Sequence, residues 1–146
     1  MRQLSTRATF AVLAFALALT GACKKKDATP PADTSTRTEA VRVSEVDLGR
    51  AIGADKRVTA GSESFTVRDT IYASVMTEGT GPATLGARWT FEDGQVVDQS
   101  TQSIAPTGPT VTEFHIMKPT AWPAGKYKVE IMLNGQAVES EDFEVK

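Results

Sequence analysis

The feature that most constrains the fold is a two-residue alternation of apolar and polar side chains, which runs from about Val41 to the end of the chain. Successive side chains of a β-strand point to opposite faces, so this period is typical of strands with one buried face. No segment of this part has a convincing helical period, so the pattern predicts an all-β domain. The clearest run places Tyr127, Val129, Ile131 and Leu133 on one face, and similar runs contain Val46, Phe65, Ile71, Leu85 and Phe114.

Two dipeptides predict where the chain turns tightly. Asp93-Gly94 follows the run that ends at Phe91, and Asn134-Gly135 follows the run that ends at Leu133. Asn-Gly and Asp-Gly readily adopt the positive φ angles of a type I′ turn. We therefore expect two β-hairpins, each with a two-residue turn.

The last strand needs one irregularity. If the second turn has two residues, Val138 lies opposite Ile131, and Phe143 then points away from the core. An extra residue between Ser140 and Asp142 returns Phe143 to the core, so we expect a β-bulge there. The strand is also expected at the edge of a sheet, because it carries four carboxylates, on Glu139, Glu141, Asp142 and Glu144.

The segment Trp122–Val129 resembles a motif of a known fold. Its residues Gly125, Tyr127 and Val129 resemble the Gly-x-Tyr-x-Cys "tyrosine corner" of immunoglobulin-like sandwiches, with Val129 at the position of the Cys. The resemblance implies a single antiparallel β-sandwich over about residues 44–146. The chain is also similar to small envelope lipoproteins that end in the pattern WPxGxYxVE, then NG, then FxV.

The resemblance assigns core positions as well. Trp89 takes the place of the family's core Trp, and Ala73 takes the place of the partner Cys of Val129. The sandwich is therefore expected without its disulfide, and the chain has only one Cys. Tyr127 and Phe143 are expected in the core, whereas Trp122 either covers one end of the sandwich or is exposed as a binding aromatic.

Residues 1–22 are typical of a bacterial secretory signal. Two arginines precede an uncharged run of 12 residues, Ala8 to Leu19. That run is too short for a bilayer about 30 Å thick, which needs about 20 residues, and it suits the apolar region of a signal peptide.

The run ends in Leu19-Thr20-Gly21-Ala22-Cys23, which resembles the lipobox of bacterial lipoproteins. The resemblance implies cleavage after Ala22 and lipidation of Cys23, so the membrane becomes a partner through lipid. Because Lys24 is not Asp, it also implies sorting to the outer membrane of a Gram-negative cell, facing the periplasm; display on the cell surface stays open. The alternative is an ordinary signal peptide with a free thiol.

Residues 24–40 contain no large apolar side chain and are rich in Thr, Pro, Ala and charge, which predicts a disordered tether. The chain is thus divided into a signal peptide (1–22), a lipidated flexible tether (23–43) and the sandwich (44–146). From Ser44 onward there are nine basic and fifteen acidic residues, a net charge of −6. This acidic balance argues against nucleic acid as a partner.

Nothing in the sequence marks a catalytic centre, so we expect no enzyme and no cofactor. His115 is the only His, and it alternates with Phe114 and Ile116, so it is expected to face outward. A Ser-His-Asp site needs a buried carboxylate, an exposed nucleophile and an oxyanion hole, and no motif indicates any of these.

One stripe of side chains is a candidate partner surface. Tyr72, Met76, His115 and Met117 are expected on the outward face of two neighbouring strands. The stripe either contacts a partner or is buried under a loop. His115 and Met117 also resemble the His-x-Met pair of periplasmic copper carriers, and these are ligands that suit Cu(I), but the further Met or His ligands of those carriers are missing.

Together these features predict a lipid-anchored, non-enzymatic envelope protein that presents an Ig-like domain to a protein or glycan. The alternatives are an inhibitor of a cell-wall hydrolase and, less favoured, a periplasmic copper-binding protein.

Overall fold

The computed structural model describes residues 39–146, so the expected cleavage site at Ala22 and the lipidation site at Cys23 lie outside the described residues. Within that range the chain forms strands and no helix, which confirms the all-β prediction. None of these described segments is therefore a helix that could cross a bilayer. The strands are β1 (Arg42–Gly49), β2 (Ser64–Phe65), β3 (Ile71–Glu78), β4 (Ala83–Phe91), β5 (Gln95–Ile104), β6 (Thr110–Ile116), β7 (Gly125–Leu133) and β8 (Gln136–Val145).

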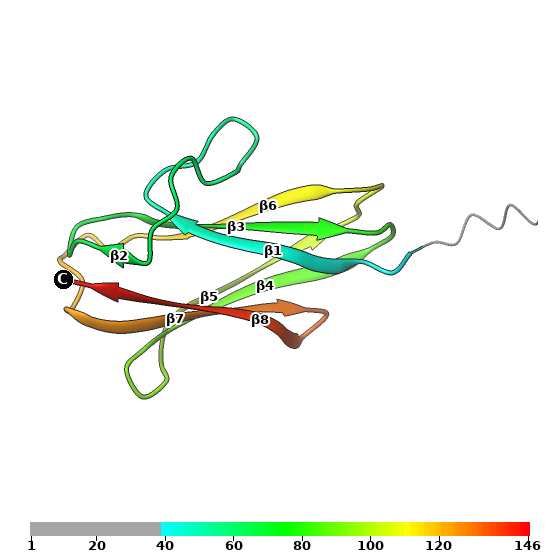
Figure 1. Ribbon diagram of the computed structural model, residues 1–146. Helices are drawn as coiled ribbons and strands as arrows, with labels where there is room; N and C mark the ends of the chain where they lie inside the picture. The colour runs from blue at the N-terminus through cyan, green and yellow to red at the C-terminus, as the bar shows by residue number, and fades with distance from the viewer. Residues whose placement is uncertain (1–38) are drawn as a thin grey trace, which may run out of the picture. The chain divides into compact units, whose positions relative to one another are not determined.

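The strands form two stacked sheets (Figure 1). One sheet has the order β1-β3-β6, and the other has the order β2-β8-β7-β4-β5. All neighbours are antiparallel except β2 and β8, which pair in parallel over two residues. This is an immunoglobulin-like sandwich, as the sequence predicted. Its first strand begins at Arg42, two residues before the domain boundary drawn from the sequence.

The core lies between the two sheets and is built from the inward face of each strand. Trp89 is fully buried on β4 and meets the ring of Phe143 on β8 edge-on, with 5.9 Å between ring centroids. Ala73 on β3 and Val129 on β7 are also fully buried. These two apolar residues occupy the places implied for the cysteines, so packing alone joins the sheets at this point.

The tyrosine corner is present at the start of β7. The hydroxyl of Tyr127 donates to the carbonyl of Pro123 over 2.8 Å, and the Tyr127 ring stacks on Phe143 with 5.3 Å between centroids. Burial raises the pKa of Tyr127, and the charge of Glu92 raises it further. Gly125 has φ 151°, and a Cβ there would lie 2.8 Å from Phe91, which explains why this position needs glycine.

The two hairpins differ in how they follow the sequence. Asn134 and Gly135 have φ angles of 52° and 84°, and Leu133 pairs with Gln136, so the expected type I′ turn is confirmed. The first hairpin exists, but the prediction of a two-residue turn in it was wrong. Phe91 pairs with Gln95, so the loop has three residues, and the positive φ angles fall on Glu92 and Gly94.

The expected bulge in β8 exists, but its predicted position was wrong. Met132 pairs with Ala137 and Ile131 pairs with Glu139, so Val138 is the extra residue, rather than one between Ser140 and Asp142. Val138 is 45% exposed, and Phe143 reaches the core directly opposite Tyr127. The alternation of the strand requires one extra residue but does not determine which one, so the bulge can form nearer the turn.

The first prediction concerns the hydroxyl of Tyr127. The variant Tyr127→Phe keeps the aromatic contacts and leaves the Pro123 carbonyl without its donor. We expect the free energy of unfolding to fall by about 1–2 kcal/mol, measured by urea denaturation. Tyr72→Phe, on the outward face, is the control and should change stability by less than about 0.5 kcal/mol. Equal losses of stability in the two variants would contradict a stabilising role for the hydrogen bond from Tyr127 to Pro123.

Candidate functional site

The stripe predicted from the sequence lies on the outward face of the β1-β3-β6 sheet. Tyr72 pairs with His115, and their ring centroids are 5.5 Å apart. Met117 follows directly after β6 and is 66% exposed. Met76 pairs with Val111, four residues along β3 from Tyr72, or about 13 Å. The structure therefore brings Tyr72, His115 and Met117 to one end of the sheet and Met76 to the other.

The connection from β1 to β2, residues 50–63, covers part of this outward face (Figure 1). The hydroxyl of Ser74 donates to the carbonyl of Lys56 over 2.6 Å and accepts from the amide of Val58 over 2.8 Å. The guanidinium of Arg57 lies 3.5 Å from the sulfur of Met76. The stripe is thus part open surface and part covered face, which are the two interpretations the sequence left open.

His115 is held by a neighbour on its own strand. Its Nδ1 lies 2.5 Å from a carboxylate oxygen of Glu113, and half of the imidazole is exposed. Among residues 39–146, no group of three or more His, Cys, Asp or Glu side chains is arranged to hold a metal ion. Met76, the other methionine of the stripe, lies at the other end of the sheet from His115 and contacts Arg57.

A groove lined by exposed apolar side chains opens between the start of β5 and the end of β6. We call it the apolar groove. It has a volume of about 560 Å³. Val96, Val97 and Met117 line it, and these are three of the four large apolar side chains that the described residues expose. His115 lines the same groove, so two of the four stripe residues belong to it. The aromatic rings of Phe91, Trp122 and Tyr127 also line it, and Gln95, Asp98 and Lys118 add polar groups to the lining.

Trp122 is fixed in place by the turn between β2 and β3. Its indole Nε1 donates to the Asp69 carbonyl over 3.0 Å, and its backbone amide donates to Val67 over 2.7 Å. Only 7% of Trp122 is exposed, and the ammonium of Lys118 lies 5.7 Å from the ring centroid. Trp122 therefore covers one end of the core and supplies a rigid wall of the groove, in which Val96, Val97 and Met117 are the large apolar side chains most exposed to solvent.

The turn that holds Trp122 is itself tied by a carboxylate. Asp69 accepts hydrogen bonds from the amide and hydroxyl of Thr66, both at 2.8 Å, and from Nε of Arg50 at 2.7 Å. The hydrogen bond from the Thr66 backbone is the largest cause of the lowered pKa of Asp69. Burial of the carboxyl raises this pKa in part, and the contact with Arg50 lowers it further. The ionised carboxylate of Asp69 thus ties Thr66 and Arg50 to the turn that holds Trp122.

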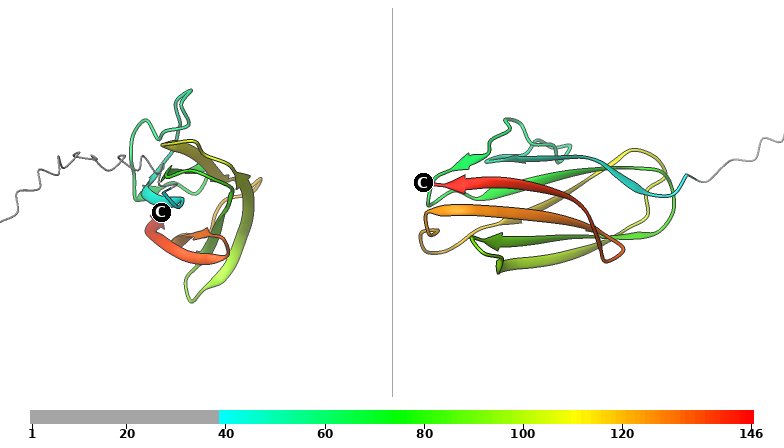
Figure 2. Two further views of the ribbon diagram at one scale, coloured as in Figure 1. Left: turned by 90° about the vertical axis from the view of Figure 1, so that its right-hand side faces the viewer. Right: turned by 60° about the horizontal axis from the view of Figure 1, so that its bottom comes forward.

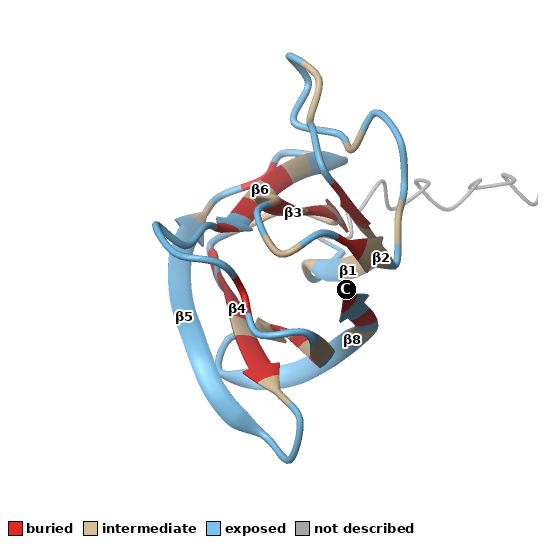
Figure 3. Ribbon diagram, turned by 90° about the vertical axis from the view of Figure 1, so that its left-hand side faces the viewer, coloured by how far each residue is buried: buried red, intermediate tan, exposed pale blue. Residues whose placement is uncertain are grey.

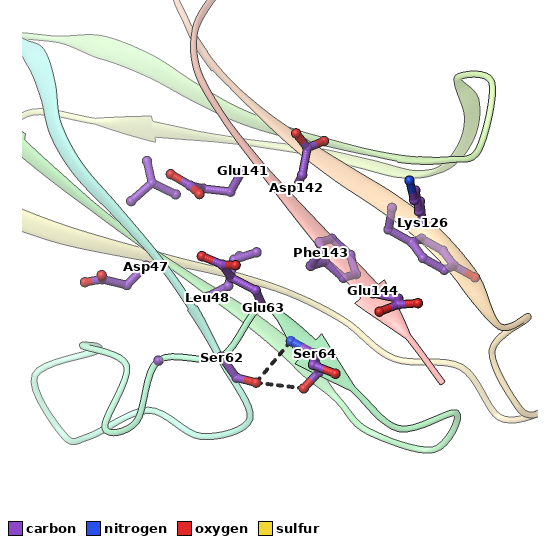
Figure 4. Close-up of a pocket in the computed structure, with 13 residues that line it drawn as sticks. Asp47, Leu48, Ser62, Glu63, Ser64, Lys126, Glu141, Asp142, Phe143 and Glu144 are labelled. Carbon is purple, nitrogen blue, oxygen red and sulfur yellow. Dashed lines mark hydrogen bonds between the residues drawn. The ribbon is translucent and has the colours of Figure 1, made fainter.

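A second groove, with a volume of about 920 Å³, lies on the opposite side of the sandwich between β1 and β8 (Figure 4). These two edge strands run side by side (Figure 2). Burial raises the pKa of Glu141, and the charges of Glu139, Glu63, Asp142 and Asp47 raise it further, in that order. We call this the acidic groove, because its lining carries Asp47, Glu63, Glu141, Asp142 and Glu144 against one cation, Lys126.

Neither groove was identified from the sequence. The acidic groove is made by β1 and β8, which lie far apart along the chain. The apolar groove is made by the consecutive strands β5 and β6 together with residues 118–127, and its shape depends on how these segments pack across the two sheets. The one available signal was Val96-Val97 beside a predicted turn, two apolar residues in succession where alternation expects one.

No protein-family model matches the chain, and no curated protein does either. Several solved structures are similar. The C-terminal domain of wzt is 12% identical over 73% of each chain, with a TM-score of 0.50. An immunoglobulin-like protein from Pseudomonas aeruginosa is 13% identical over 75% of this chain and 99% of its own, with a TM-score of 0.48.

A larger protein also contains a similar part. The alkylpurine DNA glycosylase AlkC of Pseudomonas fluorescens, solved bound to DNA with an abasic site analog, is 17% identical, with a TM-score of 0.48. The match covers 73% of this chain but only 30% of the glycosylase. At these identities the likeness extends to the Ig-like fold and no further.

The second prediction follows from the raised pKa of Glu141. The folded protein holds this proton more tightly than the unfolded chain, so ionised Glu141 lowers stability as the pH rises through and above 4.5, the usual pKa of the group. We expect Glu141→Gln to raise the melting temperature at pH 7 and to have no effect well below pH 4.5, measured by thermal unfolding across pH.

The control for this prediction is Glu130→Gln. Glu130 forms an ion pair with Arg88, so removing its charge should leave stability unchanged or lower it at pH 7. A lower melting temperature for Glu141→Gln at neutral pH would contradict the repulsion in the acidic groove.

Proposed function

We propose that this protein is a lipid-anchored, non-enzymatic component of the bacterial cell envelope, and that it presents its Ig-like domain to a protein or glycan partner. The observation that carries the proposal is the apolar groove. Exposed apolar side chains are ordinary when scattered, but a cluster of them around a concave surface is typical of a binding site.

The rigidity of the groove supports a binding role. Trp122 and Tyr127 are both buried and hydrogen-bonded to backbone carbonyls, so they lose little conformational entropy when a partner docks. His115 and Lys118 place polar groups at the rim of the groove beside the apolar side chain of Met117. An apolar centre with a polar rim is the usual arrangement of a protein interface.

The setting of His115 supports a non-catalytic role. The ring lies on the outward face of the sheet, half exposed, with one nitrogen against Glu113 and one face against Tyr72. The Ig-like fold does not itself determine a function, so the function has to be inferred from a site on its surface. The apolar groove is the site on which this proposal is based.

Anchoring is proposed from the sequence around Cys23. One acyl chain gives only marginal membrane binding, whereas two or more hold a protein stably, so a lipobox product with several chains stays in its membrane. We place the protein in the outer membrane, facing the periplasm, because Lys24 follows the Cys. The polar segment between Cys23 and β1 then connects the lipid to the domain.

The third prediction tests the groove. In native membranes, cross-linking of the full chain followed by mass spectrometry should recover a stoichiometric partner. The double variant Val97→Asp with Met117→Asp should lose that partner, because it places two charges on the apolar lining. Val138→Asp changes the one large exposed apolar residue that residues 39–146 carry outside the groove, and it should keep the partner. Recovery of the same partner with all three chains would contradict the proposal.

The fourth prediction tests the anchor. Cells grown with an alkyne-labelled fatty acid should label the wild-type chain, and Cys23→Ala should abolish the label and shift the protein out of the outer-membrane fraction. A label that persists in Cys23→Ala, or an unlabelled wild type, would show that Cys23 is not a lipid attachment site. The groove's partner can be tested separately, so failure of one half of the proposal leaves the other intact.

A further inference from the structure

The edges of the two sheets differ in how well they are protected. An edge strand exposes unpaired backbone N–H and C=O groups, and it can pair with a strand from another chain unless charge, a bulge or a covering segment prevents this. The sandwich has four edges, formed by β1, by β6, by β8 with β2, and by β5.

The edge at β1 is obstructed. The register of β1 against β3 shifts between Val43 and Glu45, which is a bulge at Ser44. At the other end, Gly49 forms a bridge with Gly61, and the amide of Ser62 donates to the carbonyl of Leu48 over 2.8 Å. The connection from β1 to β2 therefore occupies the edge where the strand is most regular.

The edge at β6 is short, and one of its acceptors is taken. The side-chain amide of Gln102, on β5, donates to the carbonyl of Glu113 over 2.7 Å. At the third edge, β2 pairs with Glu144 and Val145 of β8. The rest of β8 carries Glu139, Glu141 and Asp142, and a second strand with the same charges would be repelled.

The edge at β5 lacks these protections. β5 has ten residues, nine of them exposed, with no proline and with Asp98 as its single charged residue. Figure 3 shows nearly the whole strand as exposed ribbon, beside the largely buried β4. Its one bulge is at Val97, and from Asp98 to Ile104 it keeps a regular register with β4.

We propose that a second copy of this chain pairs with β5 in antiparallel fashion over Asp98–Ile104, extending the five-stranded sheet of each copy across a two-fold axis at Thr101. In this arrangement Gln99 lies opposite Ser103, and Asp98 lies opposite Ile104, so no like charges face each other. The carboxylates of β8 lie at the other edge of the same sheet, where they do not oppose the contact.

This interface goes beyond the partner proposed above and does not depend on it. The bulge at Val97 ends the regular run, so Val96, Val97 and Met117 stay outside the paired segment. A second copy, rather than an unrelated strand, is favoured because every molecule carries the same edge, whose single charged residue, Asp98, does not face its own copy in this pairing. The lipid anchor of the proposed function would concentrate the molecules on one surface, but the pairing does not rest on it.

Native mass spectrometry of the full chain, released from detergent, tests the proposal. The wild type should appear as a dimer. Two double variants are compared: one carries Gln99→Lys with Ser103→Lys, and the other carries Gln99→Glu with Ser103→Glu. In a dimer of either variant, like charges would lie opposite each other at two places, so each variant alone should be monomeric. An equimolar mixture of the two variants should restore a dimer of mixed mass.

The matched control is Gln136→Lys with Ser140→Lys, which adds the same charge to exposed positions of β8 and should stay dimeric. A monomeric wild type would overturn the proposal, as would a dimer that survives the lysines on β5. Failure of the mixed variants to associate would also overturn it, since charge opposition would then not explain the loss. Far-UV circular dichroism on each variant confirms that it is folded.

Discussion

The bond from the Tyr127 hydroxyl to the Pro123 carbonyl connects the core of this protein to its candidate binding surface. The Tyr127 ring stacks on Phe143 inside the sandwich, and Trp122 meets it edge-on, with 6.1 Å between centroids. Pro123 and Trp122 belong to the connection between β6 and β7, which also carries Lys118 and forms one side of the apolar groove. The packing that stabilises the fold therefore also holds the groove in shape, and the groove needs no ligand to form.

Charge divides the remaining surface into two regions. The side where β1 and β8 meet carries several carboxylates, which add to the effect of burial in raising the pKa of Glu141. This negative charge repels anionic surfaces and other copies of the same side. The side where β5 and β6 meet has few charges and exposes Val96, Val97 and Met117. If the proposed partner binds through the second side, repulsion at the first side gives the domain one preferred face for it.

Local patterns in the sequence predicted the fold class, most strands, the corner at Tyr127 and one of the two turns, because each depends on neighbours along the chain. The bulge was predicted from parity but placed too late, since parity fixes the number of extra residues and not which one is extra. β5 was recognised only at its start, because its Gln, Ser and Thr residues show no alternation. The grooves depend on how the two sheets pack against each other, so only fragments such as His115 and Met117 could be identified beforehand.

Hydrogen–deuterium exchange of the full chain tests most directly whether the apolar groove is the surface that meets a partner. The exchange of backbone amides would be compared between native membranes and the purified protein. The account predicts slower exchange in membranes at residues 95–98 and 116–122, with no change at residues 139–144 of the acidic groove. Equal exchange of the groove segments in the two preparations, or protection confined to the acidic groove, would contradict it.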